Sequence, residues 1–164
     1  GGKWGGWRGT GNGGIVGQER NTMEGTGGTG ITGQGVGCAI SADGNNAVVG
    51  GHFDNSNQGA VWVYIRSGGI WSQQGGKLVG TGSTTNSFMG DGIALSADGN
   101  TFITGGGLDN GGTDAAWVFI RRAWVWVQQV STLIGTARSG STQAVSVAVS
   151  PEANRTLVGA FVDN

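Results

Sequence analysis

The sequence predicts an all-β protein built from repeated units of about 55 residues, each a four-stranded antiparallel meander. Three observations lead to this prediction. The pentapeptide SADGN occurs at residues 41–45 and again at 96–100. Glycine fills 37 of 164 positions beside one proline and seven tryptophans, which fits neither collagen nor a disordered linker. The apolar runs are β-branched and aromatic, and such residues disfavour helix.

The strands of one unit follow from its apolar runs and its turns. We expect strands from Val36 to Ser41, Asn46 to Gly50, Ala60 to Arg66 and Ile70 to Val79, the last bent at Gly75-Gly76. Asp43-Gly44 is a two-residue hairpin signal, because both central positions favour residues that tolerate positive φ. Ser67-Gly68-Gly69 gives the same signal before the fourth strand.

The third strand of each unit is apolar without alternation, at residues 61–65 and again at 116–120. Both of its faces must therefore leave water. A sheet that is covered on both faces lies between other sheets, as blades do in a β-propeller. A three-sheet body like a β-prism, or a β-solenoid, is the alternative.

The ends of the chain match opposite halves of a unit. Trp7 falls on Trp62, and Gln18 falls on Gln73, when the sequence is shifted by 55 residues. The expected organisation is one repeat domain over residues 1–164, with a half unit at 1–30 (third and fourth strands), units at 31–85 and 86–140, and a half unit at 141–164 (first and second strands).

Each half unit leaves apolar side chains and a strand edge without cover. Two or three large side chains, at about 1.5–3 kcal/mol each, are comparable with a domain's whole stability. An open strand edge also invites pairing. The halves can meet within one chain or between chains, and we favour head-to-tail contact between copies, giving a ring or a filament. The residues assigned to this assembly are Trp4, Trp7, Ile15, Val147, Val149, Leu157 and Val158.

A family resemblance supports the same architecture. The segment Gly90-Asp91-Gly92-Ile93-Ala94-Leu95-Ser96, followed by Thr104-Gly105-Gly106 and Ala116-Trp117-Val118-Phe119, resembles the FG-GAP repeats of integrin-type β-propellers. It is also similar to bacterial surface-protein repeats built on ALSADGN, IVGG and AWVFTRSG. The likeness covers residues 31 to about 137. It implies propeller blades in an extracellular or cell-surface protein that serves adhesion and assembly.

The resemblance does not extend to the calcium loop of many FG-GAP repeats, which has the form D-x-D-x-D-G. Here that place holds one carboxylate per unit, Asp43 or Asp98, and calcium usually takes six to eight oxygens. We therefore expect no metal or cofactor. The weaker calcium candidates are Asp54, Asp109 and Asp114.

No group of residues predicts catalysis, so we expect a protein that is not an enzyme. Cys38 shares its repeat position with Ile93 and is expected in the core. His52 corresponds to Gly107 and is expected as a solvated loop residue. The glycine-rich segments 25–37 and 80–92 lack the lysine and helix of a phosphate loop. They are expected to connect units, where glycine permits close backbone approach.

Charge and tryptophan placement bear on the partners. Nine basic residues against ten acidic ones suggest no nucleic-acid binding, and no apolar stretch is long enough for membrane insertion. Trp62 and Trp117 are expected to be buried, and Trp71 and Trp126 half buried. Trp124 and Trp4 are the candidates for a ligand contact, which would make a carbohydrate-binding module the alternative function.

Overall fold

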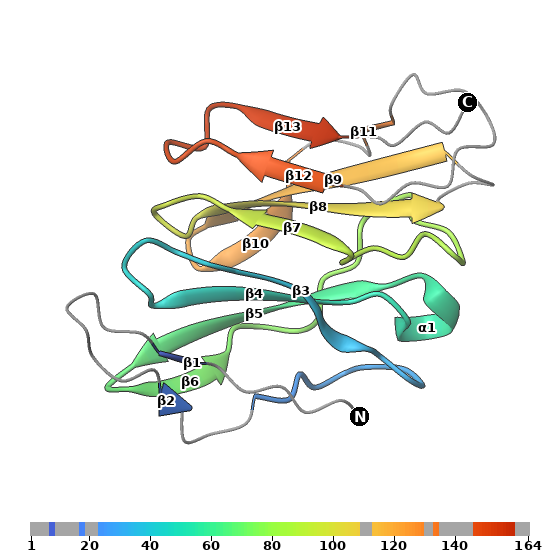
Figure 1. Cartoon of the computed structure of the whole chain (residues 1–164). Coiled ribbons are helices and arrows are strands. Elements are labelled where there is room, and N and C mark those ends of the chain that lie inside the picture. The colour runs from blue at the N-terminus through green and yellow to red at the C-terminus, as the bar shows by residue number, and fades with distance from the viewer. Residues whose placement is uncertain are drawn as a thin grey trace.

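The computed structural model of the chain describes residues 7–8, 17–18, 23–108, 113–129, 133–134 and 146–159, with only the backbone at 7, 8, 17, 18, 108, 113, 114 and 134. In this part of the chain the fold is all-β, as predicted. The one helical segment is the single turn α1 (Asp54–Asn57), which contains non-helical dihedrals at Asn55 and Ser56. Figure 1 shows the strands arranged as layers stacked along one direction.

The first sheet consists of β3 (Gln34–Ile40), β4 (Asn46–Gly51), β5 (Ala60–Ser67) and β6 (Ile70–Gln73), in that order. Every neighbouring pair is antiparallel, which confirms the predicted meander. The fourth strand is shorter than predicted. The chain bends after Gln73, where Gly75 has a φ of 74°, and Leu78 then pairs with Val61 through hydrogen bonds of 2.9 and 2.8 Å.

The second sheet repeats the first sheet at an offset of 55 residues. It contains β7 (Gly92–Leu95), β8 (Thr101–Leu108), β9 (Thr113–Arg122) and β10 (Val125–Gln128) as an antiparallel meander. The short strand β11 (Leu133–Ile134) pairs Leu133 with Ala116, as Leu78 pairs with Val61 in the first sheet. The sequence repeat is therefore a structural repeat, down to the bend in its fourth strand.

Two further strand pairs stand apart from these sheets. The C-terminal pair is β12 (Ser146–Val149) with β13 (Thr156–Gly159), and the N-terminal pair is β1 (Trp7–Arg8) with β2 (Gly17–Gln18). Figure 1 shows them at opposite ends of the stack, and they form two separate sheets. Within the described strands, the two half units do not close into one sheet inside this chain. Gln18 pairs with Trp7, whereas its repeat counterpart Gln73 pairs with Tyr64, two residues after Trp62, the counterpart of Trp7. The pairing register of the N-terminal pair therefore differs by two residues from that of the first sheet.

The two kinds of hairpin turn differ. Between β5 and β6, Gly68 and Gly69 have φ values of 58° and 83°, as the predicted two-residue turn requires. The Asp43-Gly44 turn is longer than the predicted two residues, because the last strand pair beside it is Ile40 with Ala47 and Ser41 N donates to Asn46 O. Only Gly44 in this turn has positive φ. The Asp43 carboxylate accepts hydrogen bonds from Ser41 Oγ (2.5 Å) and Asn45 N (3.0 Å), and these bonds stabilise the wider turn.

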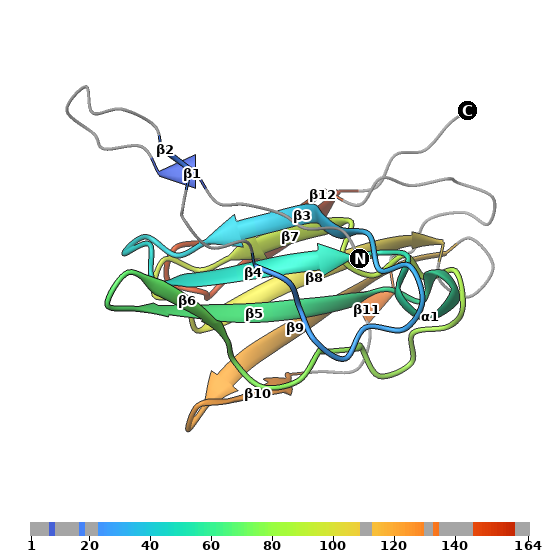
Figure 2. The same ribbon diagram turned by 90° about the horizontal axis from the view of Figure 1, so that it is seen from below.

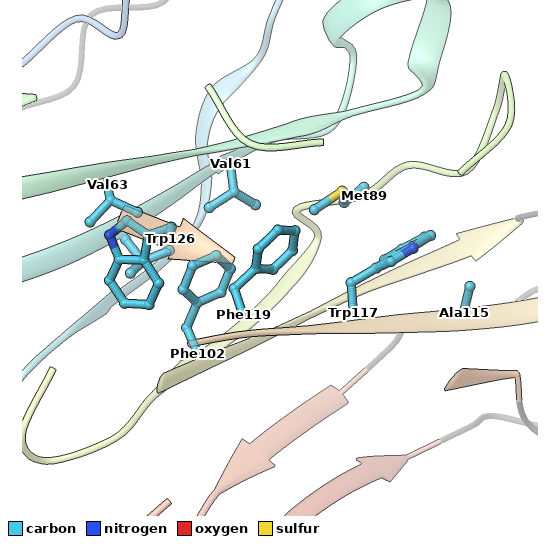
Figure 3. Packing of buried hydrophobic residues seen from close by; sticks show 9 residues of the cluster. Val61, Val63, Met89, Phe102, Ala115, Trp117, Phe119 and Trp126 are labelled. Carbon is cyan, nitrogen blue, oxygen red and sulfur yellow. The ribbon is translucent and has the colours of Figure 1, made fainter. Parts of the chain in front are cut away.

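The main core lies between the first and second sheets. Figure 3 shows Val61 and Val63 pointing from the first sheet toward the rings of Phe102, Phe119 and Trp126 on the second. Phe102 and Phe119 are stacked with ring centroids 4.9 Å apart. The opposite face of the second sheet packs its own apolar residues (Ile103, Ala116, Val118) against the C-terminal pair (Val147, Val149). Both faces of the second sheet are thus covered, which confirms the inference from its non-alternating third strand.

Trp62 and Trp117, which occupy the same position in the two units, are fully buried, as predicted, and each is covered by a glycine. An added Cβ would lie 2.3 Å from Trp62 Cδ1 at Gly25, and 2.3 Å from Trp117 Cδ1 at Gly80. Trp62 Nε1 donates to Thr26 O at 2.8 Å, and Trp117 Nε1 makes the equivalent bond to Thr81 O at 3.3 Å. The glycine-rich segments therefore serve close backbone approach, as the sequence suggested.

Candidate assembly surfaces

The outward face of the first sheet, which points away from the second sheet, is only partly covered. Its apolar residues Ala47, Val49, Ala60, Trp62 and Tyr64 are buried together with Met23. Burial, together with the nearby Glu24 carboxylate, raises the pKa of the Tyr64 phenol to about 12. Along β3, by contrast, Val36 is 48% exposed and Ile40 is 59% exposed. This strand is the open part of the face.

Cys38 lies on this open part, so its predicted place in the core is wrong. It pairs with Val49 and is exposed. Its counterpart Ile93 packs against the core between the two sheets. The reason for the difference is the neighbouring layer: the first sheet covers the face of β7 that carries Ile93, whereas within the described residues no sheet covers the outward face of β3 that carries Cys38. Equivalent positions in a repeat are buried only where the next layer is present.

The covered part of the outward face is held by a polar latch, which we define as Gly25, Thr29, Gln34, Asp54 and Lys77. The Gln34 amide bonds Gly25 in both directions, at 2.7 and 3.1 Å. The Asp54 carboxylate is fully buried and accepts from Thr29 N and from Lys77 Nζ, each at 2.6 Å. These bonds hold the segment from Met23 onward against Trp62.

In the latch, the two carboxylate oxygens of Asp54, one of the weaker calcium candidates, accept hydrogen bonds from the Thr29 amide and the Lys77 ammonium. Asp109 lies outside the described residues, and only the backbone of Asp114 is described. In the described part of the chain, no group of three His, Cys, Asp or Glu side chains could hold a metal ion.

The C-terminal pair presents a covered face and an open one. Val147 and Val149 pack on the second sheet inside the chain, and Val158, which pairs with Val147, lies on the same face and is 38% exposed. Leu157 lies on the opposite face and is 70% exposed. In the second sheet, β8 pairs with β7 on one edge and with β9 on the other. The corresponding strand β13 pairs, as far as the structure describes the chain, with β12 alone. Of the other assembly residues, Trp4 and Ile15 lie outside the described residues, and Trp7 is described only as backbone in β1.

A series of hydrogen bonds that the sequence did not predict joins the turns that follow β3, β7 and β12, the first strands of the three units. Ala42 N donates to Ala97 O at 3.0 Å, and Ala97 N donates to Pro151 O at 3.2 Å. Figure 2 shows the strands beside these turns, β3, β7 and β12, gathered along one margin of the stack. The repeated sequences Ser-Ala-Asp-Gly and Ser-Pro-Glu-Ala predict the turns themselves. They do not predict that the turns contact one another, because that contact depends on how the sheets stack.

Arg121 makes a second link between the first and second sheets. Its Nη1 donates to Asn46 Oδ1 at 2.8 Å and to Gln74 Oε1 at 3.3 Å, both on the first sheet, while Nε donates to Asn100 Oδ1 at 2.9 Å. Burial lowers the pKa of the Arg121 guanidinium, and the negative charges of Asp98 and Asp43 partly offset this by raising it. A single arginine in a strand carries no sequence signal for this role.

His52 was expected in solvent and is instead a contact between sheets. Its side chain is 17% exposed and its Nδ1 pairs with Asp91 Oδ1, just before β7. Its ring lies 3.9 Å from that of Phe53 between centroids, and 5.9 Å from that of Phe88. The imidazole therefore stabilises the junction of the sheets.

Comparison of the sequence with protein-family models and with curated proteins gave no match. Among the described residues, no helix has the length and apolar character needed to cross a bilayer. The surfaces above are therefore interpreted from their own geometry.

Proposed function

We propose that the protein is a non-enzymatic repeat protein of the extracellular or cell surface that assembles head to tail. Its units act as blades of β-propeller type, and the split sheet is completed between copies. The observation that carries this proposal is the edge of β13 that no described strand pairs, with the N-terminal pair placed at the other end of the stack. The FG-GAP resemblance supports the surface location and the adhesive role.

The second sheet indicates what the open edge lacks. There, β8 pairs with β9 over six registered residues, and β10 extends the sheet further. The sequence assigns the third and fourth strands of a unit to residues 1–30. In the proposed contact, these residues of one copy pair with β13 of the next and remove its unpaired backbone groups.

The open part of β3 supports the same contact. Inside the chain, β7 lies between β3 and β12, so first strands already stack on one another twice. In a head-to-tail pair, β12 and β13 of one copy would cover Cys38 and Ile40 of the other. A proposed junction of this kind buries the exposed Leu157 as well.

The test is the association of the purified chain, measured by sedimentation velocity across protein concentration. We expect oligomers at concentrations on the order of 10–100 μM, a range usual for a modest apolar contact. Ile40→Asp should weaken association by about tenfold or more, since it places a charge in the contact. The matched control is Ile70→Asp, because Ile70 is 61% exposed but lies at the β5–β6 turn, outside the junction.

Cys38 offers a second measurement without mutation. It is the chain's single cysteine and is exposed, so maleimide labelling should slow as protein concentration rises. A compact monomer at 100 μM or so, with labelling independent of concentration, contradicts the proposal. Equal association of the Ile40 and Ile70 variants would show that the junction lies elsewhere.

A further inference from the structure

The turn between β9 and β10 holds bulky residues where the first unit has glycines. Ala123 and Trp124 have φ values of 47° and 68°. The equivalent Gly68 and Gly69 have 58° and 83°, so the two turns share one backbone conformation. Glycine adopts it freely, whereas an alanine or a tryptophan there is strained. The second unit thus keeps an indole at a position that folding alone would give to glycine.

The Trp124 side chain is exposed, with a cation over its ring, and its backbone is held by a hydrogen bond. It is 74% exposed, the Arg121 guanidinium lies 5.4 Å from its ring centroid, and Gln74 Nε2 donates to its carbonyl oxygen at 3.1 Å. Arg121 is itself fixed by Asn46 and Asn100. One side of the indole therefore rests on an anchored cation while most of the ring faces solvent.

We propose that Trp124 is the stacking platform of a carbohydrate-binding site whose ligand is a pyranose ring of a polysaccharide. The C–H bonds on the face of a pyranose pack on a flat aromatic surface, and its hydroxyls stay in water. The group over the Trp124 ring is the Arg121 guanidinium, which is charged and hydrogen-bonded, and this suits a sugar better than an apolar protein surface. A strained residue that persists in a turn points to a function for its side chain, and the side chain at this position is the Trp124 indole.

The site is distinct from the proposed junction, because Trp124 lies on the β9–β10 turn, whereas the junction is formed by β3, β12, β13 and residues 1–30. The binding test can therefore use the Ile40→Asp background to keep the chain unassembled. Failure of binding there leaves the assembly proposal untouched, and failure of assembly leaves this one untouched.

The experiment titrates cellotetraose, chitotetraose and galactotetraose into ¹⁵N-labelled protein and follows the indole N–H signals by NMR. We expect at least one sugar to bind in the millimolar range and to shift the Trp124 signal. Trp124→Gly should remove that signal and weaken binding by about tenfold or more, while the melting temperature stays level or rises. The readouts separate loss of the platform from loss of the fold.

Ala123→Gly is the matched control, since it relieves strain in the same turn and keeps the indole. It should raise the melting temperature by about 2–4 °C and leave the affinity within about twofold. The proposal is overturned if none of the three sugars binds at about 10 mM, or if Trp124→Gly binds as the parent does. A Trp124→Gly chain that melts several degrees lower and shows no change in binding would assign the indole a structural role instead.

Discussion

The two faces of the first sheet are buried in different ways. Toward the second sheet, side chains of two regular sheets interlock, with Trp117 and Phe102 fully buried. On the outward face, a glycine-rich segment lies over Trp62 and is held by the polar latch. Both tryptophans lie under a glycine-rich segment, at Gly25 and at Gly80, so the difference lies in the cluster around each: that of Trp117 spans two sheets and that of Trp62 contains one. One face depends on apolar packing between layers, and the other depends on a few hydrogen bonds and one ion pair.

The largest loss of stability is expected from a substitution in the apolar core between the two sheets. Trp117→Ala removes a fully buried ring from the cluster packed between the two sheets and should lower the free energy of unfolding by about 3–5 kcal/mol. Trp62→Ala should cost less, because among the described residues its cluster contains only the first sheet and adjoining segments, which can settle into the space. Urea denaturation of both variants measures the difference. Equal losses would mean that the two faces are equally rigid.

The second largest loss of stability is expected from a substitution in the polar latch on the outward face. Lys77→Met leaves the fully buried Asp54 carboxylate without its ammonium partner, and should cost about 1–3 kcal/mol, since Lys77 itself is 22% exposed. Hydrogen exchange should speed up at the Thr29 amide, which donates to Asp54. The double variant Asp54→Asn, Lys77→Met restores neutrality and should recover part of the loss. Unchanged exchange at Thr29 would show that the segment is held by other contacts.

The smallest effect concerns pH and the turns beside both faces. The hydrogen bond from Ser96 Oγ, followed by the bonds from Asn100, holds the pKa of the Asp98 carboxyl below its usual 3.8. A depressed pKa in the folded state contributes stability that is complete above the unfolded value and is lost as pH falls through the folded value. We expect urea midpoints that are level above about pH 5 and fall below pH 4.

Asp98→Asn should flatten this acid-side fall by well under about 1 kcal/mol, because the carboxylate is exposed and screened. Asp43→Asn is the comparison variant, since the pKa of Asp43 is lowered for the same reason, chiefly by Ser41. An acid-side slope that is identical in all three proteins would exclude these turns as its source.

The strand positions could be predicted because the signals for them are local. The glycine pair at residues 68–69 and the apolar run at 61–65 determine a turn and a strand by themselves. The burial of Trp62 and Trp117 followed from a strand that is apolar on both sides. These inferences need only the backbone period and the demand that apolar side chains leave water.

The remaining features depend on which layer lies beside which. Cys38 and Ile93 share a repeat position, yet only Ile93 has a sheet over it. His52 has no counterpart imidazole in the other units, and its contact with Asp91 joins two sheets across 39 residues. Arg121 reaches Asn46 from the neighbouring sheet in the same way. A pattern within one unit carries no information on such contacts.

The donor series through the turns gives the stack a direction. Ala42 donates its amide hydrogen to Ala97, and Ala97 donates its own to Pro151, so each layer is bound to the next with the same polarity. Proline has no amide hydrogen, and the series therefore ends at the third turn. A further layer beyond Pro151 could not receive this bond, so the two ends of the stack differ chemically: Ala42 and Ala97 donate from this position, and Pro151 can only accept.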